Sequence, residues 1–249
     1  MAETTNMKVG MVMTTYSTRG HRRDLALTSV RSLLQNTERE NFHLVIVDDN
    51  SLDDLPKLLC REFANDDRVT LFLREQNCGV GANKREGIFR LIEKIGVPDM
   101  FYLCDDDLIY QPKWIDYALQ MFVDLEKTEQ VGMFGIWRHP VHPVLENFIY
   151  IRDPRYTLLR VAELPGCCVF IRPDVYHRMG MWDVGRKTDK RGDDVATTAR
   201  VRGLGYGLFS VTPPIVLHEG HVYPTGKEVC YHDEQIRENK EWIRIEEDR

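Results

Sequence analysis

The chain has 249 residues, of which 43% are hydrophobic and 29% are charged, and its formal net charge is −6. A chain of this size and composition can bury a substantial core, which argues against a disordered protein or a small disulfide-dependent scaffold. The acidic balance gives no overall attraction to nucleic acid or to anionic membranes.

Targeting and redox signals in the sequence favour a cytoplasmic protein. No run approaches the ~18 apolar residues needed to cross a bilayer, and residues 1–6 lack the basic and then apolar pattern of a signal peptide. The six cysteines are scattered and form no C-x-x-C pair. We therefore expect free thiols in a reducing compartment, either a cell's cytoplasm or, for a viral protein, that of its host.

Strand and helix patterns alternate along the first half. We predict strands over 8–14, 42–47, 69–73 and 100–104, and helices over 24–35, 55–64, 81–95 and 114–126. This β-α-β-α order predicts a mainly parallel sheet covered by helices on both faces.

The second half is less regular, with strands predicted over 131–137, 148–152, 169–172 and 215–217 and helices over 173–179 and 194–202. No Gly/Ser/Pro-rich linker divides the chain. We therefore expect one α/β domain over 1–249, with a nucleotide-sugar-binding half over 7–110, an acceptor and catalytic half over 111–222, and a tail over 223–249.

Three of the predicted strands end in polar clusters, namely Thr14-Thr15-Tyr16, Asp48-Asp49-Asn50-Ser51 and Asp105-Asp106-Asp107. Ligands of open parallel sheets bind beyond the carboxyl ends of the strands, so these clusters are expected to converge on a site. Ordinary turn chemistry explains any one cluster well, but it explains three in succession poorly.

The aspartate triplet predicts a cation site. Adjacent carboxylates repel one another, and Mg²⁺ or Mn²⁺ bound by one or two of them together with substrate phosphates would offset that repulsion. Alternation along a strand would point Asp105 and Asp107 to the same side. The alternative is a solvated turn at the start of a helix before Pro112.

Further motifs follow in a fixed order, at Asn77–Ile88, Gly166–Tyr176, Met179–Asp183 and Gly192–Asp194, with His218 beyond them. Together with Met13–Tyr16, Ile46–Ser51 and Leu103–Asp107, these segments resemble the family 2 glycosyltransferases of the GT-A fold over about residues 8–218. Lys84 and Arg85 depart from the arginine and asparagine that are usual in that family.

The resemblance implies an inverting, metal-dependent transferase that moves a sugar from a nucleotide-sugar, most simply a UDP-sugar, to a hydroxyl acceptor. It implies a metal site for Mn²⁺ or Mg²⁺ at Asp107, Asp105 and His218. Donor contacts are expected from Thr14, Thr15, Tyr16, Arg19, Asp48, Asp49, Ser51, Asn77, Gly79, Asn83, Lys84, Asp105 and Asp106.

The catalytic base is expected at Asp194, at the start of a predicted helix, where a carboxylate is stabilised. Asp193 is the alternative base, and a simple helix cap is the alternative role for Asp194. Trp182 and Asp183 are expected beside the acceptor, although Trp182 also suits a core position. The basic runs at residues 19–23 and 186–191 are taken as solvated surface.

Two other classes of protein remain open. A sugar nucleotidyltransferase would normally carry a glycine-rich loop after the first strand, which residues 14–20 lack. A non-catalytic sugar- or nucleotide-binding module would not need both the aspartate triplet and Gly192-Asp193-Asp194. The acceptor is left open between a saccharide, a lipid-linked sugar, a protein side chain and a modified DNA base.

Overall fold

The computed structural model describes residues 4–18, 20–138, 142–181 and 193–219. Its first half contains β1 (Val9–Thr15), α1 (Gly20–Asn36), β2 (Phe42–Asp48), α2 (Leu55–Phe63), β3 (Val69–Leu73), α3 (Val80–Ile95), β4 (Met100–Asp105), β5 (Leu108–Tyr110) and α4 (Trp114–Glu126). Its second half contains β6 (Val131–Gly135), β7 (Val144–Ile149), β8 (Thr157–Val161), β9 (Cys168–Ile171), α5 (Pro173–Arg178), α6 (Asp193–Gly203), β10 (Gly207–Thr212) and β11 (Val216–His218).

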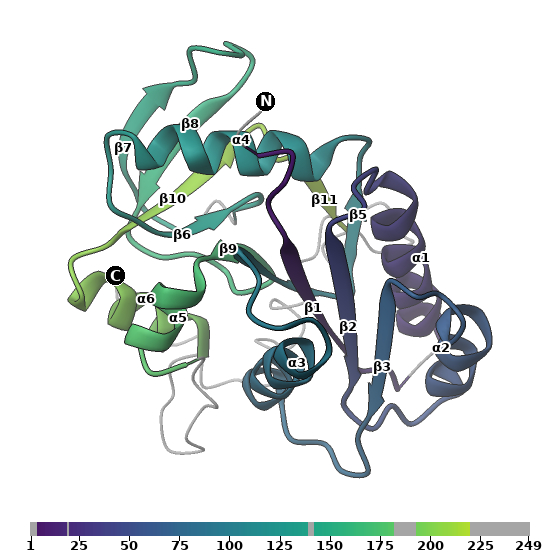
Figure 1. The fold of residues 1–249 in the computed structure, drawn as a ribbon. Helices are drawn as coiled ribbons and strands as arrows, with labels where there is room; N and C mark the ends of the chain where they lie inside the picture. The colour runs from purple at the N-terminus through teal and green to yellow at the C-terminus, as the bar shows by residue number, and fades with distance from the viewer. Residues whose placement is uncertain (1–3, 19, 139–141, 182–192, 220–249) are drawn as a thin grey trace, which may run out of the picture.

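Nine strands form one sheet in the order β3-β2-β1-β4-β9-β6-β10-β8-β7. Strands β3, β2, β1 and β4 are parallel neighbours, as the alternating pattern predicts. Only β8 and β9, among the described strands of this sheet, run against the rest. The fold is therefore a mixed α/β architecture with a mostly parallel central sheet, whose strands β1 to β3 point their carboxyl ends to the lower part of Figure 1.

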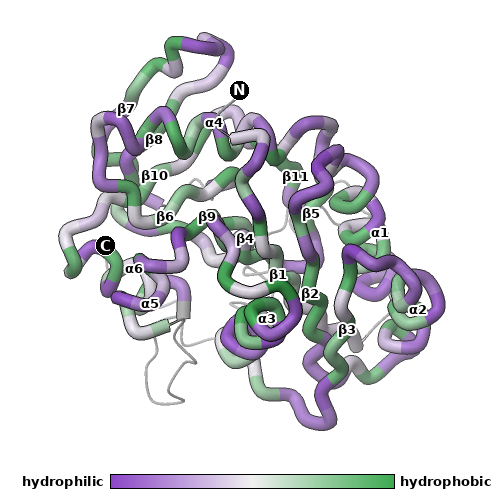
Figure 2. Tube along the Cα trace, viewed as in Figure 1, coloured by the Kyte–Doolittle hydropathy of each residue, from purple (hydrophilic) through white to green (hydrophobic). Residues whose placement is uncertain are grey.

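Two hydrophobic cores lie on the two faces of the sheet. One core gathers buried side chains of α1, α2 and α4, and the other gathers those of α3, α5 and α6. Alternation along β1 serves both, because Met11 and Met13 enter the first core and Val12 enters the second. In Figure 2 the central strands β1 and β2 are mostly green, whereas the turn between β3 and α3 is purple.

The second half differs from the sequence prediction at the β7–β8 hairpin and at β10. The predicted strand over 148–152 is in fact β7, which ends at Ile149, and a tight turn follows. In that turn Asp153 N–H donates to Tyr150 O at 3.2 Å, and Tyr150 N–H donates to Tyr156 O at 3.1 Å. The strands β5, β8 and β10 were not predicted. β5 and β10 pair with strands distant in sequence, whereas β8 forms a hairpin with its neighbour β7.

Gly87 lets α3 approach the sheet closely. A Cβ placed there would lie 2.2 Å from Val12 Cγ1 and 3.1 Å from Val47 Cγ2. We expect Gly87→Ala to lower the free energy of unfolding by about 1–3 kcal/mol, because these buried valines must shift. Urea unfolding tests this, with the exposed Gly203→Ala as control, since nothing lies within 4 Å of a Cβ there. Equal stability of the two variants would contradict the packing described here.

No helix in the described part of the chain is both long and apolar enough to span a membrane.

Candidate functional site

The polar ends of β1, β2 and β4 meet at one edge of the sheet. The strand register places Thr14 beside Asp105 and Thr15 beside Asp48. Thr14 Oγ1 donates to Asp105 Oδ1 at 3.2 Å, and Thr15 Oγ1 donates to Asp48 Oδ2 at 2.9 Å. The convergence predicted from three polar strand ends is therefore present, and Tyr16 adjoins it with 39% of its surface exposed.

Asp48 and Ser51 shape the turn after β2. Ser51 donates from its backbone N–H to Asp48 Oδ1 at 2.9 Å and from its hydroxyl to Asp48 Oδ2 at 2.6 Å. Asn50 between them takes a φ of 63°, a conformation that asparagine tolerates better than most residues. Asp48 is buried, and its carboxylate oxygens accept hydrogen bonds from Ser51 in this turn and from Thr15.

Asp49 ties the same turn to the start of α3. Its Oδ1 accepts the Cys78 N–H at 2.8 Å and its Oδ2 accepts the Gly79 N–H at 2.9 Å. Asn77 adds a third link by donating from Nδ2 to Asp49 O at 3.2 Å. Gly79 has a φ of 85°, which glycine adopts without strain. The segments expected to contact a nucleotide are thus held together as one rigid loop pair.

Lys84 lies inside the protein rather than at its surface. Its side chain is 1% exposed, and its Nζ donates to Gly166 O at 2.8 Å and pairs with Asp105 Oδ1 at 3.2 Å. The neighbouring Asn83 is also buried, and its Oδ1 accepts no hydrogen bond from the described residues. The buried ammonium therefore contacts the strand-end cluster through the Asp105 carboxylate.

Asp106 and Asp107 follow β4 in a bend, and the alternation expected along a strand does not continue through them. Arg22 of α1 reaches both: its NH2 donates to Asp106 Oδ1 at 2.8 Å and its NH1 to Asp107 Oδ2 at 3.2 Å. Asp105 has the different partners Thr14 and Lys84. The regular strand ends with β4 at Asp105. Asp106 and Asp107 therefore share the Arg22 guanidinium, while Asp105 is directed to Thr14 and Lys84.

The two later aspartates are buried, so the alternative of a solvated turn at the start of a helix is wrong. Asp106 is 2% exposed and Asp107 is 7% exposed, and β5 follows them, not a helix. Burial raises the pKa of Asp106 to about 7, although the Arg22 charge opposes that rise. Asp106 Oδ2 and Asp107 Oδ1 are buried and have no hydrogen-bond partner among the described residues.

His218 faces this pair of aspartates across a small second sheet. Strand β11 pairs antiparallel with β5, and the Glu219 N–H donates to Asp107 O at 2.8 Å. His218 Nε2 lies 3.4 Å from Asp107 Oδ1, and its ring stacks on Trp137 with centroids 4.5 Å apart. Burial is the largest single influence on the pKa of His218 and lowers it, but the Asp107 carboxylate, Cys167 and Asp105 together raise that pKa to about 9.

These residues could hold a divalent cation only if a bound substrate supplied further ligands. Asp107 Oδ1 and His218 Nε2 lie 3.4 Å apart and would supply an oxygen ligand and, once the ring has lost its extra proton, a nitrogen ligand. Asp107 Oδ1 makes no hydrogen bond to a described residue. No three His, Cys, Asp or Glu side chains of the described ranges form a complete cage. Such an incomplete set is what Mg²⁺ and Mn²⁺ sites use when substrate phosphates complete the coordination.

The first turn of α6 contains the predicted base. Helix α6 packs on β6 and β10, and residues 204–206 join it to β10. Because the chain reverses there, the first turn of α6 points toward the carboxyl ends of β6 and β10. These strands run in the same direction as β4, which ends at Asp105. Asp194 is half-buried in that turn, and its carbonyl accepts the Thr198 hydroxyl at 2.9 Å.

Four predicted residues cannot be located at the site. Arg19, Trp182 and Asp183 lie outside the described residues, and so does the side chain of Asp193.

Arg22 and Trp137 are two residues near the aspartates that sequence reasoning did not single out. Arg22 belongs to a basic run at the start of α1, which was expected to be solvated surface. Its neighbour Arg23 does lie on the surface, paired with Asp24 and Asp54. Adjacent residues of a helix point to different sides, so the way α1 packs on the sheet decides which of the two arginines faces the aspartates.

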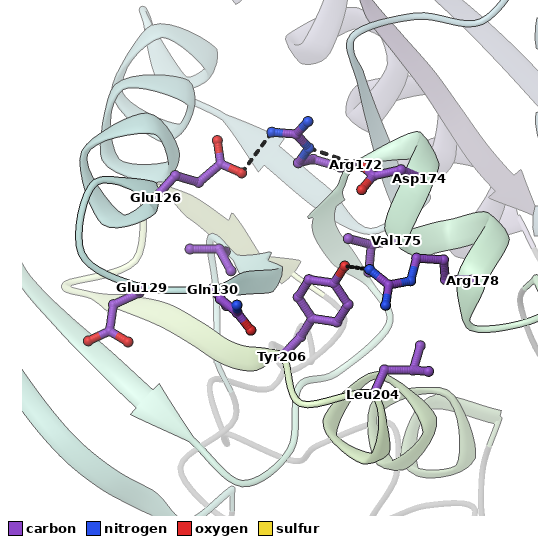
Figure 3. Close-up of a pocket in the computed structure, with 10 residues that line it drawn as sticks. Glu126, Glu129, Gln130, Arg172, Asp174, Val175, Arg178, Leu204 and Tyr206 are labelled. Atoms are coloured by element: carbon purple, nitrogen blue, oxygen red, sulfur yellow. Dashed lines mark hydrogen bonds and ion pairs between the residues drawn. The ribbon is translucent and has the colours of Figure 1, made fainter.

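A surface pocket of about 340 Å³ lies elsewhere on the molecule. Figure 3 shows it between α4, α5 and the turn after α6, with Arg178 donating to the Tyr206 hydroxyl at 2.6 Å. Arg172 in its wall follows Ile171, which pairs with Phe101 near the start of β4. The pocket is therefore at the opposite end of the sheet from Asp105.

The fold and the aspartate cluster together define a class of protein, and the comparisons name its family. The sequence model of glycosyl transferase family 2 matches residues 11–180, and the chain belongs to that family. A curated relative, the glucosyl-dolichyl phosphate glucuronosyltransferase of Haloferax volcanii, is 28% identical over 195 residues. That match covers 74% of this chain and 59% of the relative, so the chain spans less than two thirds of the relative's length.

Solved structures share the fold. The mannosyltransferase PcManGT from Pyrobaculum calidifontis, in complex with GDP-Man and Mn²⁺, has a TM-score of 0.59 at 18% identity, over 84% of this chain and 55% of its own. GalNAc-T7 with UDP, GalNAc and Mn²⁺ has a TM-score of 0.61 at 14% identity, over 85% of this chain and 43% of its own. These likenesses bear out the expected GT-A architecture.

Proposed function

We propose that this chain is a metal-dependent, inverting glycosyltransferase that moves a sugar from a nucleotide-sugar to a hydroxyl acceptor. The donor we propose first is a UDP-sugar. The observation that carries the proposal is the buried aspartate cluster at the carboxyl edge of the sheet, with Asp107 Oδ1 facing His218. Membership of glycosyl transferase family 2 supports the same reaction class. The Mn²⁺ and nucleotides bound by both structural neighbours support the ligand class.

The donor would lie over the turns that follow β1 and β2. Asp49 and Tyr16 are assigned to the base or ribose, because Tyr16 is exposed beside a turn that Asp49 makes rigid. Lys84 would act by fixing Asp105. The remaining donor assignments are Thr14, Thr15, Arg19, Asp48, Ser51, Asn77, Gly79, Asn83 and Asp106.

Asp107, Asp105 and His218 are the residues that would hold Mn²⁺ or Mg²⁺. When bound there, the cation would neutralise charge that develops on the leaving nucleoside diphosphate. Asp107 offers a buried oxygen that no described donor satisfies, and a carboxylate in this state is stabilised by a cation. Asp105 would need to turn away from Thr14 and Lys84 to join Asp107, and a third of its side chain is exposed.

Asp194 is assigned as the base that takes the proton from the acceptor hydroxyl. A carboxylate held opposite the leaving group allows one direct displacement, which inverts the anomeric centre. The direction of α6 supports this, because α6 packs on β6 and β10, which run in the same direction as β4, and leads by a short connection into β10. Asp193 is the alternative base, and Trp182 with Asp183 are assigned to the acceptor side.

The acceptor class we place first is a saccharide hydroxyl. The Haloferax volcanii relative carries a lipid-linked sugar in its name, so a lipid-linked saccharide belongs in the acceptor panel. A protein side chain and a modified DNA base are the remaining candidates, and the net charge of −6 weighs against DNA.

A product assay separates this proposal from its rivals. The chain is incubated with UDP- and GDP-sugars and Mn²⁺, with EDTA in a parallel series, and the released phosphates are identified. A glycosyltransferase is expected to release nucleoside diphosphate from a suitable donor in the Mn²⁺ series, and EDTA should stop the release. Release of pyrophosphate would instead indicate a nucleotidyltransferase, and no release with any donor and acceptor would indicate a binding module.

A further inference from the structure

Arg22 connects the first turn of α1 to the two buried aspartates across 84 and 85 residues of sequence. Its side chain is 20% exposed, while those of Asp106 and Asp107 are 3% and 9% exposed. The guanidinium uses separate nitrogens for the two carboxylates, at 2.8 Å and 3.2 Å. One arginine thus bridges both aspartates from the side of α1.

The bridge engages one oxygen of each carboxylate and leaves the other. Arg22 contacts Asp106 Oδ1 and Asp107 Oδ2, so Asp107 Oδ1 remains directed toward His218 Nε2 at 3.4 Å. A planar guanidinium fixes two acceptors in one geometry, which a lysine ammonium cannot do to the same degree. The contact therefore sets the rotation of the Asp107 carboxylate.

The contact of Arg22 with Asp106 and Asp107 balances the negative charge of the two carboxylates in the absence of a metal ion. Asp105 is paired with Lys84, while Asp106 and Asp107 have Arg22 as their shared cation and His218 beside Asp107. Without Arg22, the two adjacent buried carboxylates would repel each other and lose the partner that fixes their orientation. The Asp107 carboxylate could then turn away from its present direction toward His218, which would weaken it as a ligand.

We propose that Arg22 is a positioning residue, which presents Asp107 Oδ1 to the metal and thereby strengthens metal binding, although it is itself a cation. The inference rests on the proposed function, since it assigns a role to Arg22 toward the metal of that site. Simple electrostatics predicts the opposite sign: a cation that only competes with Mn²⁺ would weaken its binding. The sign of the effect therefore decides between positioning and competition.

The test measures Mn²⁺ binding directly, by electron paramagnetic resonance of free Mn²⁺ in the presence of UDP or GDP. Wild type is compared with Arg22→Met, Arg22→Lys and the surface control Arg23→Met, each shown to be folded by circular dichroism. We expect the Kd for Mn²⁺ to rise about 10–100-fold in Arg22→Met, the usual cost of losing a residue that orients a metal ligand. The Kd of Arg22→Lys should lie between those of wild type and Arg22→Met, and the Kd of Arg23→Met should equal that of wild type.

Binding in Arg22→Met that equals or exceeds wild type would overturn the role of Arg22 while leaving the proposed function in place. Failure of wild type itself to bind Mn²⁺ with either nucleotide would overturn both. If Arg22→Met does not fold, Arg22→Lys decides the matter, because it keeps the charge: an unchanged Kd would then refute positioning by the guanidinium fork, and a raised Kd would support it.

Discussion

Asp107→Asn is expected to remove nearly all Mn²⁺-dependent transfer, lowering kcat/KM by about a thousandfold, because a bound metal ion contributes several kcal/mol to such a reaction. The change is close to isosteric and leaves an oxygen for Arg22. It also removes the charge that makes Asp107 a cation ligand. Initial rates over a range of Mn²⁺ concentrations measure the effect.

The control for this substitution is Asp67→Asn, which alters an exposed aspartate between α2 and β3. It should leave both the rate and the Mn²⁺ dependence unchanged. Circular dichroism should show Asp107→Asn to be folded, since the site lies at the edge of the sheet. Transfer at the wild-type rate in Asp107→Asn would show that the metal is held by other residues.

Asp194→Asn is expected to lower kcat by roughly 10²–10⁴-fold, the usual contribution of a general base. Asp194 is the second residue of α6 rather than its N-cap, and a carboxylate there interacts with the helix dipole by only about 0.3–1 kcal/mol, so the free energy of unfolding should change little. A residue that only stabilised the first turn of α6 would show the reverse in Asp194→Ala, with a loss of up to about 1 kcal/mol in stability and a modest loss of rate. Parallel rates and urea unfolding for both variants separate the two roles.

Asp193→Asn belongs in the same series, because the neighbouring carboxylate is the alternative base. A large loss of kcat in Asp193→Asn alone would move the assignment by one residue. The anomeric configuration of the product, read by NMR, tests the displacement itself. Retention of configuration would rule out the single displacement assigned to this chain.

The first half of the fold could be predicted because its signals are local. Residues 69–73 and 114–126 are the strand β3 and the helix α4, with the boundaries that their hydrophobic periodicity predicts. The meeting of Thr14 with Asp105 followed from a general property of parallel sheets, that carboxyl ends share one edge. The second half was harder, because β9 runs antiparallel between β4 and β6, which no local pattern reveals.

The contacts around the aspartates were the least predictable part of the site. Lys84 was expected to contact the donor, but it is buried against Asp105 and Gly166. Arg22 was grouped with surface cations, but it bridges Asp106 and Asp107. Such contacts depend on how α1 and α3 pack against β4, and residue type alone does not encode that. His218 was placed by family resemblance, and the structure brings it within 3.4 Å of Asp107.

The most direct test of the whole account is a crystal structure of the chain with Mn²⁺ and a nucleoside diphosphate, with the metal located by anomalous scattering. A manganese peak is expected in coordination contact, at about 2.0–2.3 Å, with a carboxylate oxygen of Asp107. The nucleotide is expected over the turns that contain Tyr16 and Asp49. Manganese and nucleotide bound together elsewhere, for instance in the pocket beside Arg178, with Asp107 still held only by Arg22 and His218, would contradict it.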